Sequence, residues 1–132
     1  MITARQCLLN TDVLIDYLRG QPQARALFMQ LPQDCAVSAV TVAELHVGVR
    51  DGPELMALKA LLASMEVIDL GGAIASSGGL LRRDWGTSHG LGLNDALIAA
   101  TALHSHRFLL TLNTKHFPML NASDCAAPYV KI

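Results

Sequence analysis

The stretch CLLNTDVLIDYL, residues 7–18, changes character at its centre. Its first apolar run is typical of a short buried strand, which we expect over Gln6–Asn10. The apolar residues then take up a helical spacing, which predicts a helix over Asp12–Arg19. Open α/β sheets place functional polar residues where a strand gives way to a helix. Asn10 and Asp12 are therefore the first candidates for a functional site.

Short apolar runs and helical periods alternate along the rest of the chain. Strands that alternate with helices are typical of a parallel sheet covered on both faces. We therefore predict a three-layer α/β/α sandwich with a mainly parallel central sheet, forming a single domain over residues 1–132. Further strands are expected at 35–40, 67–70 and 108–112, with an edge strand at 128–132; further helices are expected at 23–31 (ending at Pro32), 41–50, 53–66, 73–85 (interrupted at Gly78-Gly79) and 95–106 (capped by Asn94), and a loop at 86–93.

Composition limits the classes of protein that the chain could represent. Its 132 residues are 52 % hydrophobic and only 5 % aromatic, which suits one core of helices packed on a sheet. No apolar run approaches the roughly 18–20 residues that span a bilayer, and the N-terminus lacks the apolar segment of a signal peptide. Three scattered cysteines without a CxxC pair predict reduced thiols and a cytoplasmic location. The net charge of -1 gives no overall basic surface for nucleic acid, although a small patch can suffice.

Polar residues interrupt the apolar elements at corresponding places. Asn10 and Asp12 follow the first strand, and Glu44 is expected in the first turn of the helix after the second strand. Asp95 opens a later helix, and Asn113 follows the strand at 108–112. The carboxyl ends of parallel strands lie on one edge, so these groups should converge. Clustered carboxylates repel one another unless a cation is present, and Mg²⁺ or Mn²⁺ suits a site made of oxygen ligands.

Four segments carry a family resemblance that extends over nearly the whole chain. They are LLNTDVLIDYLRG, SAVTVAELHVGVR, HGLGLNDALIAATAL and LLTLNTKHF. With these segments the chain resembles the PIN-domain family, in particular VapC-type toxins of bacterial toxin–antitoxin pairs. The resemblance implies a Mg²⁺- or Mn²⁺-dependent endoribonuclease that hydrolyses RNA. It also implies a toxin homodimer and a cognate VapB-type antitoxin that blocks the acidic pocket.

The resemblance also assigns roles to single residues. The second and third acids of the family match Glu44 and Asp95, and its variable fourth position matches Asn113. The first acid heads a DTN or DTD triplet, whose head here is Asn10 and whose third member is Asp12. The resemblance thus implies metal ligands at Asn10, Asp12, Glu44 and Asp95, and catalytic roles for Asp12, Glu44, Asp95 and Asn113.

The amide at position 10 departs from the family pattern. Asn10 has the shape of an aspartate but no charge, so we expect weaker Mg²⁺ binding and poorer cleavage than an aspartate would give. Two explanations stay open: an original aspartate was changed deliberately, or the natural protein uses Asp12 instead or has lost activity. In the last case the chain would be a catalytically inactive PIN domain that acts as a binding module in an antitoxin or repressor complex.

Each candidate residue also has a plain structural interpretation. Asp12 could cap a helix, Glu44 could favour a helix dipole, and Asp95 could simply begin a helix. A further comparison, of NTDVL with the DxDx[TV] motif of haloacid-dehalogenase-like phosphatases, fails because the first aspartate of that motif is absent. Weaker candidates for RNA contacts, each of which could equally be an ordinary turn or surface residue, are Thr11, Lys115, His116, Arg82 and Arg83.

Overall fold

A parallel sheet forms the centre of the molecule in the computed structural model, which describes residues 6–31 and 35–131. Within these residues the sheet has five strands in the order β3-β2-β1-β4-β5, and all neighbouring strands run parallel. This topology places the carboxyl ends of the strands on one edge, as the alternating pattern predicted. The strands are β1 (Cys7–Leu9), β2 (Ala36–Ser38), β3 (Glu66–Ile68), β4 (Phe108–Leu110) and β5 (Cys125–Ala126).

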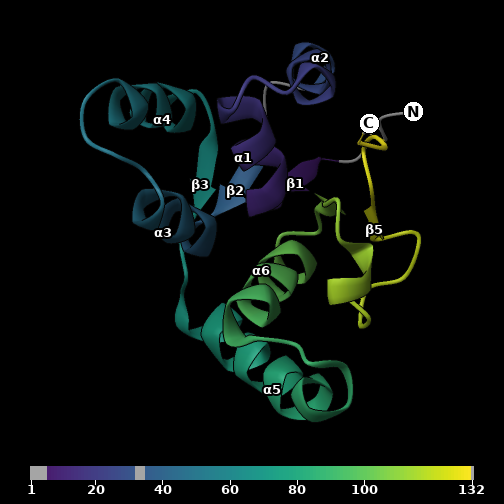
Figure 1. Ribbon diagram of the computed structural model, residues 1–132. Coiled ribbons are helices and arrows are strands. Elements are labelled where there is room, and N and C mark those ends of the chain that lie inside the picture. The colour runs from purple at the N-terminus through teal and green to yellow at the C-terminus, as the bar shows by residue number, and fades with distance from the viewer. Residues whose placement is uncertain (1–5, 32–34, 132) are drawn as a thin grey trace.

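Helices cover both faces of this sheet (Figure 1). On one face Leu8 of β1 packs in a cluster with Ile98. On the other face Cys7 and Leu9 pack in a second cluster with Leu14 and Leu58. Because neighbouring side chains of a strand point to opposite faces, three residues of β1 supply both halves of the core. The helices are α1 (Thr11–Leu18), α2 (Pro22–Gln30), α3 (Ala39–Val47), α4 (Pro53–Ala63), α5 (Gly72–His89) and α6 (Leu93–His104), followed by a short 3₁₀ helix, η1 (Thr114–His116).

The predicted three-layer α/β/α sandwich is confirmed, but the interruption expected inside α5 is wrong. The helix runs through Gly78 and Gly79 and continues to His89, so residues 86–89 are helical where a loop was predicted. A Cβ added at Gly78 would lie 2.5 Å from Cδ2 of Leu97 in α6. Gly78 therefore allows α5 and α6 to approach closely and does not break the helix.

Several other boundaries differ from the prediction. Helix α4 ends at Ala63 and not at residue 66, and strand β3 is Glu66–Ile68 and not 67–70. Helix α3 begins at Ala39 because the Ser38 hydroxyl accepts a hydrogen bond from the Val40 N–H, so Glu44 lies in the second turn. Helix α6 begins at Leu93 with Gly92 as its N-cap, so Asn94 is a helical residue and not the cap. Pro32, which was expected to end the second helix, lies outside the described residues. The last strand is Cys125–Ala126, whereas the prediction placed it at 128–132.

The C-terminal segment instead lies against α1 and α2. Asp16 is only 4 % exposed, and its carboxylate accepts a hydrogen bond from the Tyr129 hydroxyl at 3.0 Å. Lys131 Nζ lies 2.9 Å from the same carboxylate, and Gln23 Nε2 donates to the Val130 carbonyl. A buried carboxylate needs such partners, and here they fix the end of the chain against the helix that follows β1.

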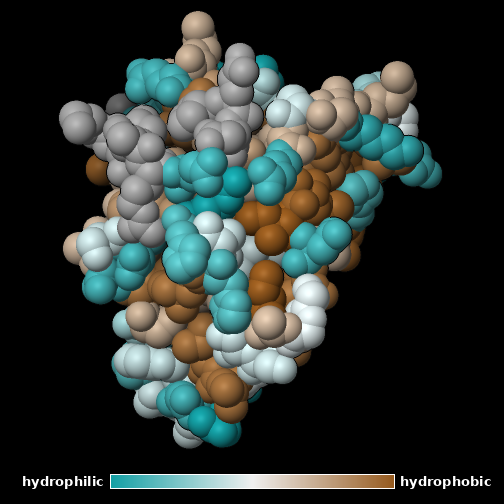
Figure 2. All heavy atoms as spheres, turned by 180° about the vertical axis from the view of Figure 1, so that it is seen from behind, coloured by the Kyte–Doolittle hydropathy of each residue, from teal (hydrophilic) through white to brown (hydrophobic). Residues whose placement is uncertain are grey.

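Apolar surface is also present outside the core. Figure 2 shows, on the face opposite to that of Figure 1, apolar side chains gathered near the centre and reaching toward one end. Large apolar side chains that are at least two-fifths exposed include Leu70, Leu80, Leu93 and Leu103. In the part of the chain that the structure describes, no helix is long and apolar enough to cross a membrane.

Candidate metal and active site

The predicted site residues lie on the segments that follow β1 and β4 and on helices α3 and α6. Asn10 follows β1 and is the N-cap residue of α1, so Asp12 lies in the first turn of that helix. The segment after β4 reaches this turn, because the Asn10 N–H donates to the Leu110 carbonyl and the Leu112 N–H donates to Asp12. Glu44 and Asp95 approach the same edge from α3 and α6.

Asn10 and Asp12 meet at the hydroxyl of Thr111. Asn10 Nδ2 donates to Thr111 Oγ1 at 3.0 Å, and Thr111 Oγ1 donates to Asp12 Oδ2 at 3.1 Å. Asp12 Oδ2 also accepts from the Leu112 N–H at 2.9 Å and from Asn113 Nδ2 at 3.3 Å. Asp12 thus bonds to the segment after β4 and does not cap its own helix.

The second oxygen of each side chain has no such partner. Among the described residues, neither Asn10 Oδ1 nor Asp12 Oδ1 has a hydrogen-bond donor, although both atoms are buried. Burial raises the pKa of Asp12, and the Leu112 N–H and Thr111 hydroxyl act in the opposite direction. An unpartnered buried oxygen is costly, and a cation is one group that could satisfy it.

Glu44 is held by the hydroxyl of Thr11, which is itself hydrogen-bonded to the hydroxyl of Thr41. Thr11 Oγ1 lies 2.6 Å from Glu44 Oε1 and 3.0 Å from the hydroxyl of Thr41. Because a carboxylate only accepts, Thr11 donates its proton to Glu44 and receives the Thr41 proton. Asn94 Nδ2 donates to the other oxygen of Glu44 at 3.3 Å. These contacts hold the carboxylate at the end of α3 that faces α6.

Burial and the charges of neighbouring groups shift the pKa of Asp95. Burial raises its pKa most, and the charges of Glu44 and Asp12 raise it further, while His116 lowers it. His116 Nδ1 lies 3.8 Å from Asp95 Oδ2. The side chains of Asp95 and His116 are 33 % and 63 % exposed, so this pair is partly open to solvent. The charges of Glu44 and Asp12 therefore reach Asp95, which is the like-charge repulsion expected of neighbouring carboxylates.

The weaker RNA candidates fall in different places. The Thr11 hydroxyl is hydrogen-bonded to Glu44 and Thr41. Lys115 is exposed on η1, the short helix that Asn113 precedes. Arg82 and Arg83 are exposed on α5, where Arg83 pairs with Asp84 at 2.8 Å. His89, expected in a loop, lies in the last turn of the same helix.

Three residues of this region were not among the predicted site residues. Thr41 precedes Glu44 by three positions on one helix, so helical spacing could have placed both on one face. Thr111 ends the strand that leads to Asn113, which gives the same strand-end signal as Asn10. Asn94 was assigned to helix capping, and only the position of α6 against α3 reveals its contact with Glu44.

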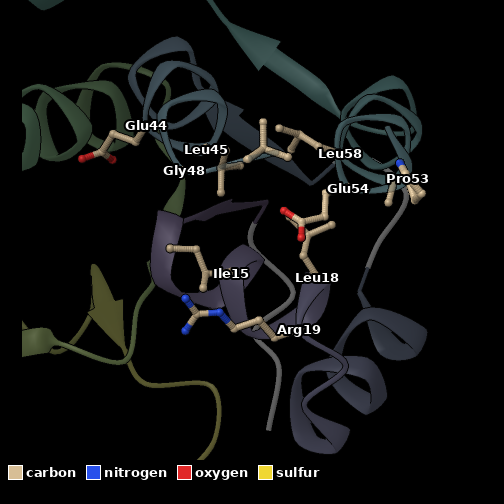
Figure 3. Close-up of a pocket in the computed structure, with 11 residues that line it drawn as sticks. Ile15, Leu18, Arg19, Glu44, Leu45, Gly48, Pro53, Glu54 and Leu58 are labelled. Atoms are coloured by element: carbon tan, nitrogen blue, oxygen red, sulfur yellow. The ribbon is translucent and has the colours of Figure 1, made fainter. Parts of the chain in front are cut away.

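A groove of about 580 Å³ begins at Glu44 and runs between α1, α3 and α4. Figure 3 shows Glu44 at one end, with its carboxylate turned away from the other labelled side chains, and Pro53 at the opposite end. The groove is mainly apolar, and its charged members outside the acidic region are Arg19 and Glu54. Its apolar lining includes Ile15, Leu18, Leu45, Val49 and Leu58.

The side chains of this region can be compared with the ligands that a divalent ion prefers. Within residues 6–31 and 35–131, no three His, Cys, Asp or Glu side chains are arranged closely enough to hold a metal by themselves. The amide of Asn10 stands beside Asp12 and adds a further oxygen to this set. Carboxylate and amide oxygens are the ligands that Mg²⁺ and Mn²⁺ prefer, so the buried, unpartnered oxygens of Asn10 and Asp12 suit such an ion chemically.

Comparisons with known proteins agree with this architecture. The profile of the PIN domain family matches residues 7–119. The chain is 39 % identical over 126 residues to Ribonuclease VapC19 of Mycobacterium tuberculosis, covering 92 % of this chain and 98 % of that protein. It is 42 % identical over 115 residues to Ribonuclease VapC10 of the same organism, covering 85 % and 86 %.

A solved structure extends the likeness to three dimensions. A toxin–antitoxin complex from Klebsiella pneumoniae contains a chain with a TM-score of 0.81 and 29 % identity, covering 96 % of this chain and all of that one. The match of the PIN profile to most of the chain, together with relatives of about 40 % identity over nearly their full length, shows that the chain belongs to the PIN domain family and, within it, to the VapC-type proteins.

Proposed function

We propose that the chain is a divalent-metal-dependent endoribonuclease and the toxin of a toxin–antitoxin pair, acting in the cytoplasm. The observation that carries the proposal is the pair of buried, unpartnered oxygens on Asn10 and Asp12, with Asp95 near enough to Glu44 and Asp12 for their charges to raise its pKa. Its VapC-type relatives are named ribonucleases, which supports RNA as the substrate.

In this proposal the chain's own residues bind and orient the reactants. Asp12, Glu44 and Asp95 supply negative charge for Mg²⁺ or Mn²⁺, and Asn10 supplies a neutral oxygen. When bound, such an ion neutralises phosphate charge and lowers the pKa of bound water. Asn113 keeps Asp12 in place through its side-chain N–H, and Thr11 does the same for Glu44. Lys115 is the exposed cation closest in sequence to Asn113 and is available to contact the RNA backbone.

The first experiment compares cleavage of a mixed RNA substrate with and without a chelator. Glu44→Gln should lower cleavage at least about tenfold, because a charge-assisted contact is lost from the ion. The matched control is Glu54→Gln, which alters an exposed glutamate paired with Arg50 and should leave cleavage unchanged. Cleavage that survives both chelation and Glu44→Gln would contradict the metal-dependent proposal.

A second candidate function is an inactive PIN domain that only binds its antitoxin. The neutral side chain at position 10 and the incomplete acidic set favour it. This candidate predicts tight antitoxin binding by a chain that never cleaves RNA, whatever metal is added. Metal-dependent cleavage by the purified chain, lost in Glu44→Gln, would exclude it.

The groove beside Glu44 is our proposed docking site for the antitoxin. Its apolar lining suits an apolar peptide segment, and the excess of carboxylates at its end suits an arginine or lysine side chain. The toxin–antitoxin complex from Klebsiella pneumoniae supports a partner of this kind. Co-expression with the neighbouring gene product should yield a complex that blocks cleavage.

The antitoxin proposal can be tested with two substitutions on one helix. Ala57 and Ala63 are both exposed on α4, but only Ala57 lines the groove. Ala57→Asp should weaken binding of the neighbouring gene product, whereas Ala63→Asp should not. Equal binding by both variants would place the antitoxin elsewhere on the surface.

We also propose a homodimer, supported by the exposed apolar side chains of α5 and α6. Leu80 is 50 % exposed and Leu93 is 52 % exposed, so these two neighbouring helices offer apolar side chains to a second copy of the chain. Light scattering should report twice the monomer mass, and Leu80→Lys should reduce it. A monomer at tens of micromolar would contradict this proposal.

A further inference from the structure

The hydroxyl of Thr111 accepts and donates in fixed directions. Thr111 is completely buried, and its oxygen receives hydrogen bonds from Asn10 Nδ2 at 3.0 Å and from the Asn113 N–H at 3.1 Å. Its single proton is donated to Asp12 Oδ2 at 3.1 Å. A hydroxyl has one proton and two lone pairs, so this group has no further capacity. It therefore requires a donor from position 10 and an acceptor at position 12.

Position 12 is constrained a second time by the backbone. The Leu112 N–H and Asn113 Nδ2 also donate to Asp12 Oδ2, at 2.9 Å and 3.3 Å. An amide N–H₂ in place of this oxygen would face three donors. An asparagine at position 12 would have to turn its oxygen toward these donors. Its N–H₂ would then face the position that a cation would occupy.

These hydrogen bonds determine which atom of Asn10 and which atom of Asp12 remains without a partner. Asn10 uses its Nδ2, so its Oδ1 is the atom without a partner; Asp12 uses its Oδ2, so its Oδ1 is the atom without a partner. Asn10 is only 7 % exposed, so solvent barely reaches this oxygen. Both unpartnered atoms are oxygens, and oxygens are the ligands that a hard cation prefers.

We infer that the first acid of the PIN pattern has moved from position 10 to position 12 in this chain. Asp12 supplies the charged ligand through Oδ1, Asn10 supplies a neutral ligand through Oδ1, and Thr111 is a positioning residue that fixes which atom of each faces the ion. The inference rests on the proposed metal site and refines it. It selects, from the explanations left open by the sequence, the one in which Asp12 takes the role.

The reverse order does not suit this hydrogen-bond network. An aspartate at position 10 would place a lone pair where Thr111 now receives a proton, and two carboxylates would compete for one hydroxyl proton. Asn10→Asp therefore adds a charge but removes a hydrogen bond. In metal-free protein at neutral pH we expect a lower melting temperature for Asn10→Asp than for the unchanged chain.

The decisive variant is the double exchange Asn10→Asp/Asp12→Asn, which restores the family order and keeps the total charge. Binding of Mn²⁺ alone would be measured by calorimetry and by electron paramagnetic resonance, for the unchanged chain, Asp12→Asn and the double exchange. We expect a loss of affinity of about tenfold or more for both variants, the size of one lost charge-assisted contact. If position 10 were the natural place of the charge, the double exchange would bind as well as the unchanged chain or better.

Controls separate positioning from folding. Thr111→Ser keeps the hydroxyl and should retain Mn²⁺ affinity within about threefold, whereas Thr111→Val should lose most of what Asp12→Asn loses. Circular dichroism and melting would accompany each titration. Should the double exchange not fold, Asp12→Asn decides alone, and unchanged Mn²⁺ affinity in that variant would overturn the inference.

The two proposals fail in different ways. An unchanged chain that binds no Mn²⁺ at millimolar concentration would refute the metal site and this refinement together. Binding by the unchanged chain with equal binding by the double exchange would refute only the exchange of roles. Binding by the unchanged chain with tenfold losses in Asp12→Asn and the double exchange supports both.

Discussion

The acidic site has an inner half and an outer half that differ in burial and hydrogen bonding. The inner half is Asn10, Asp12 and Thr111, where Asn10 and Thr111 are buried and the contacts join β1, α1 and the end of β4. The outer half is Thr11, Glu44 and Asp95, with Asn94 and His116 at its edge, where side chains are partly exposed. The inner half is therefore held by buried hydrogen bonds, whereas the outer half is more open to solvent.

The largest effect on stability should come from the inner half. Thr111→Val removes a buried hydroxyl with three hydrogen-bond partners and should lower the free energy of unfolding by about 1–3 kcal/mol. Urea denaturation measures this change, with Thr111→Ser as the control that keeps the hydroxyl. A loss no larger than that of Thr11→Val would remove the distinction between the two halves.

Thr11→Val should have a smaller effect on stability and a clearer effect on Glu44. Its hydroxyl donates to Glu44, but the group is only partly buried, so water can replace it at a cost of about 0.5–1.5 kcal/mol. Mn²⁺ affinity should fall by a few-fold because Glu44 loses its fixed position. Thr11→Ser should restore affinity, and a Thr11→Val variant with unchanged Mn²⁺ binding would show that Thr11 does not orient Glu44.

Metal-free protein should show a pH dependence that originates in Asp95. Burial, followed by the charge of Glu44, raises the pKa of Asp95 above its usual 3.8. The folded state therefore holds a proton that the unfolded chain has already released, so this contribution to stability is present below pH 3.8 and is lost as pH rises through the folded pKa.

The measurement is the urea midpoint of the metal-free chain and of Asp95→Asn between pH 4 and pH 7. The midpoint of the unchanged chain should fall relative to that of Asp95→Asn as pH rises. Parallel curves for the two proteins would mean that neither burial nor the neighbouring acids raise the pKa of Asp95. Asp84→Asn serves as a control, because Arg83 lowers the pKa of that exposed carboxyl and gives the opposite sign.

The smallest effect should come from His116. Its ring nitrogen lies 3.8 Å from Asp95 and the side chain is 63 % exposed, so His116→Gln should change stability by less than about 0.5 kcal/mol at pH 5.5. The pKa of Asp95 should nevertheless rise, because His116 lowers it. Nuclear magnetic resonance titration of the Asp95 carboxyl measures that shift, and no shift would exclude His116 from the site.

Local sequence alone determined the parallel three-layer fold. The apolar run before Asn10 and the helical spacing after Asp12 gave the first strand–helix junction. Equivalent junctions predicted that Glu44, Asp95 and Asn113 would approach one edge. The fold prediction is confirmed because strand and helix periods are local properties, and because strands that alternate with helices form parallel sheets.

Only the tertiary structure decided the contacts between elements. Gly78 resembles a helix interruption in sequence, but α6 packs so closely that Leu97 leaves no room for a Cβ there. Asn94 resembles a helix cap in sequence, but α3 lies so close that the Asn94 side chain donates a hydrogen bond to Glu44. The roles of Asn10 and Asp12 depend on Thr111, which is about a hundred residues away in sequence (the Asn10–Thr111 separation is 101). Packing between β1 and β4 determines which atoms of Asn10 and Asp12 face which hydrogen-bond donors. The linear sequence pattern does not contain this information.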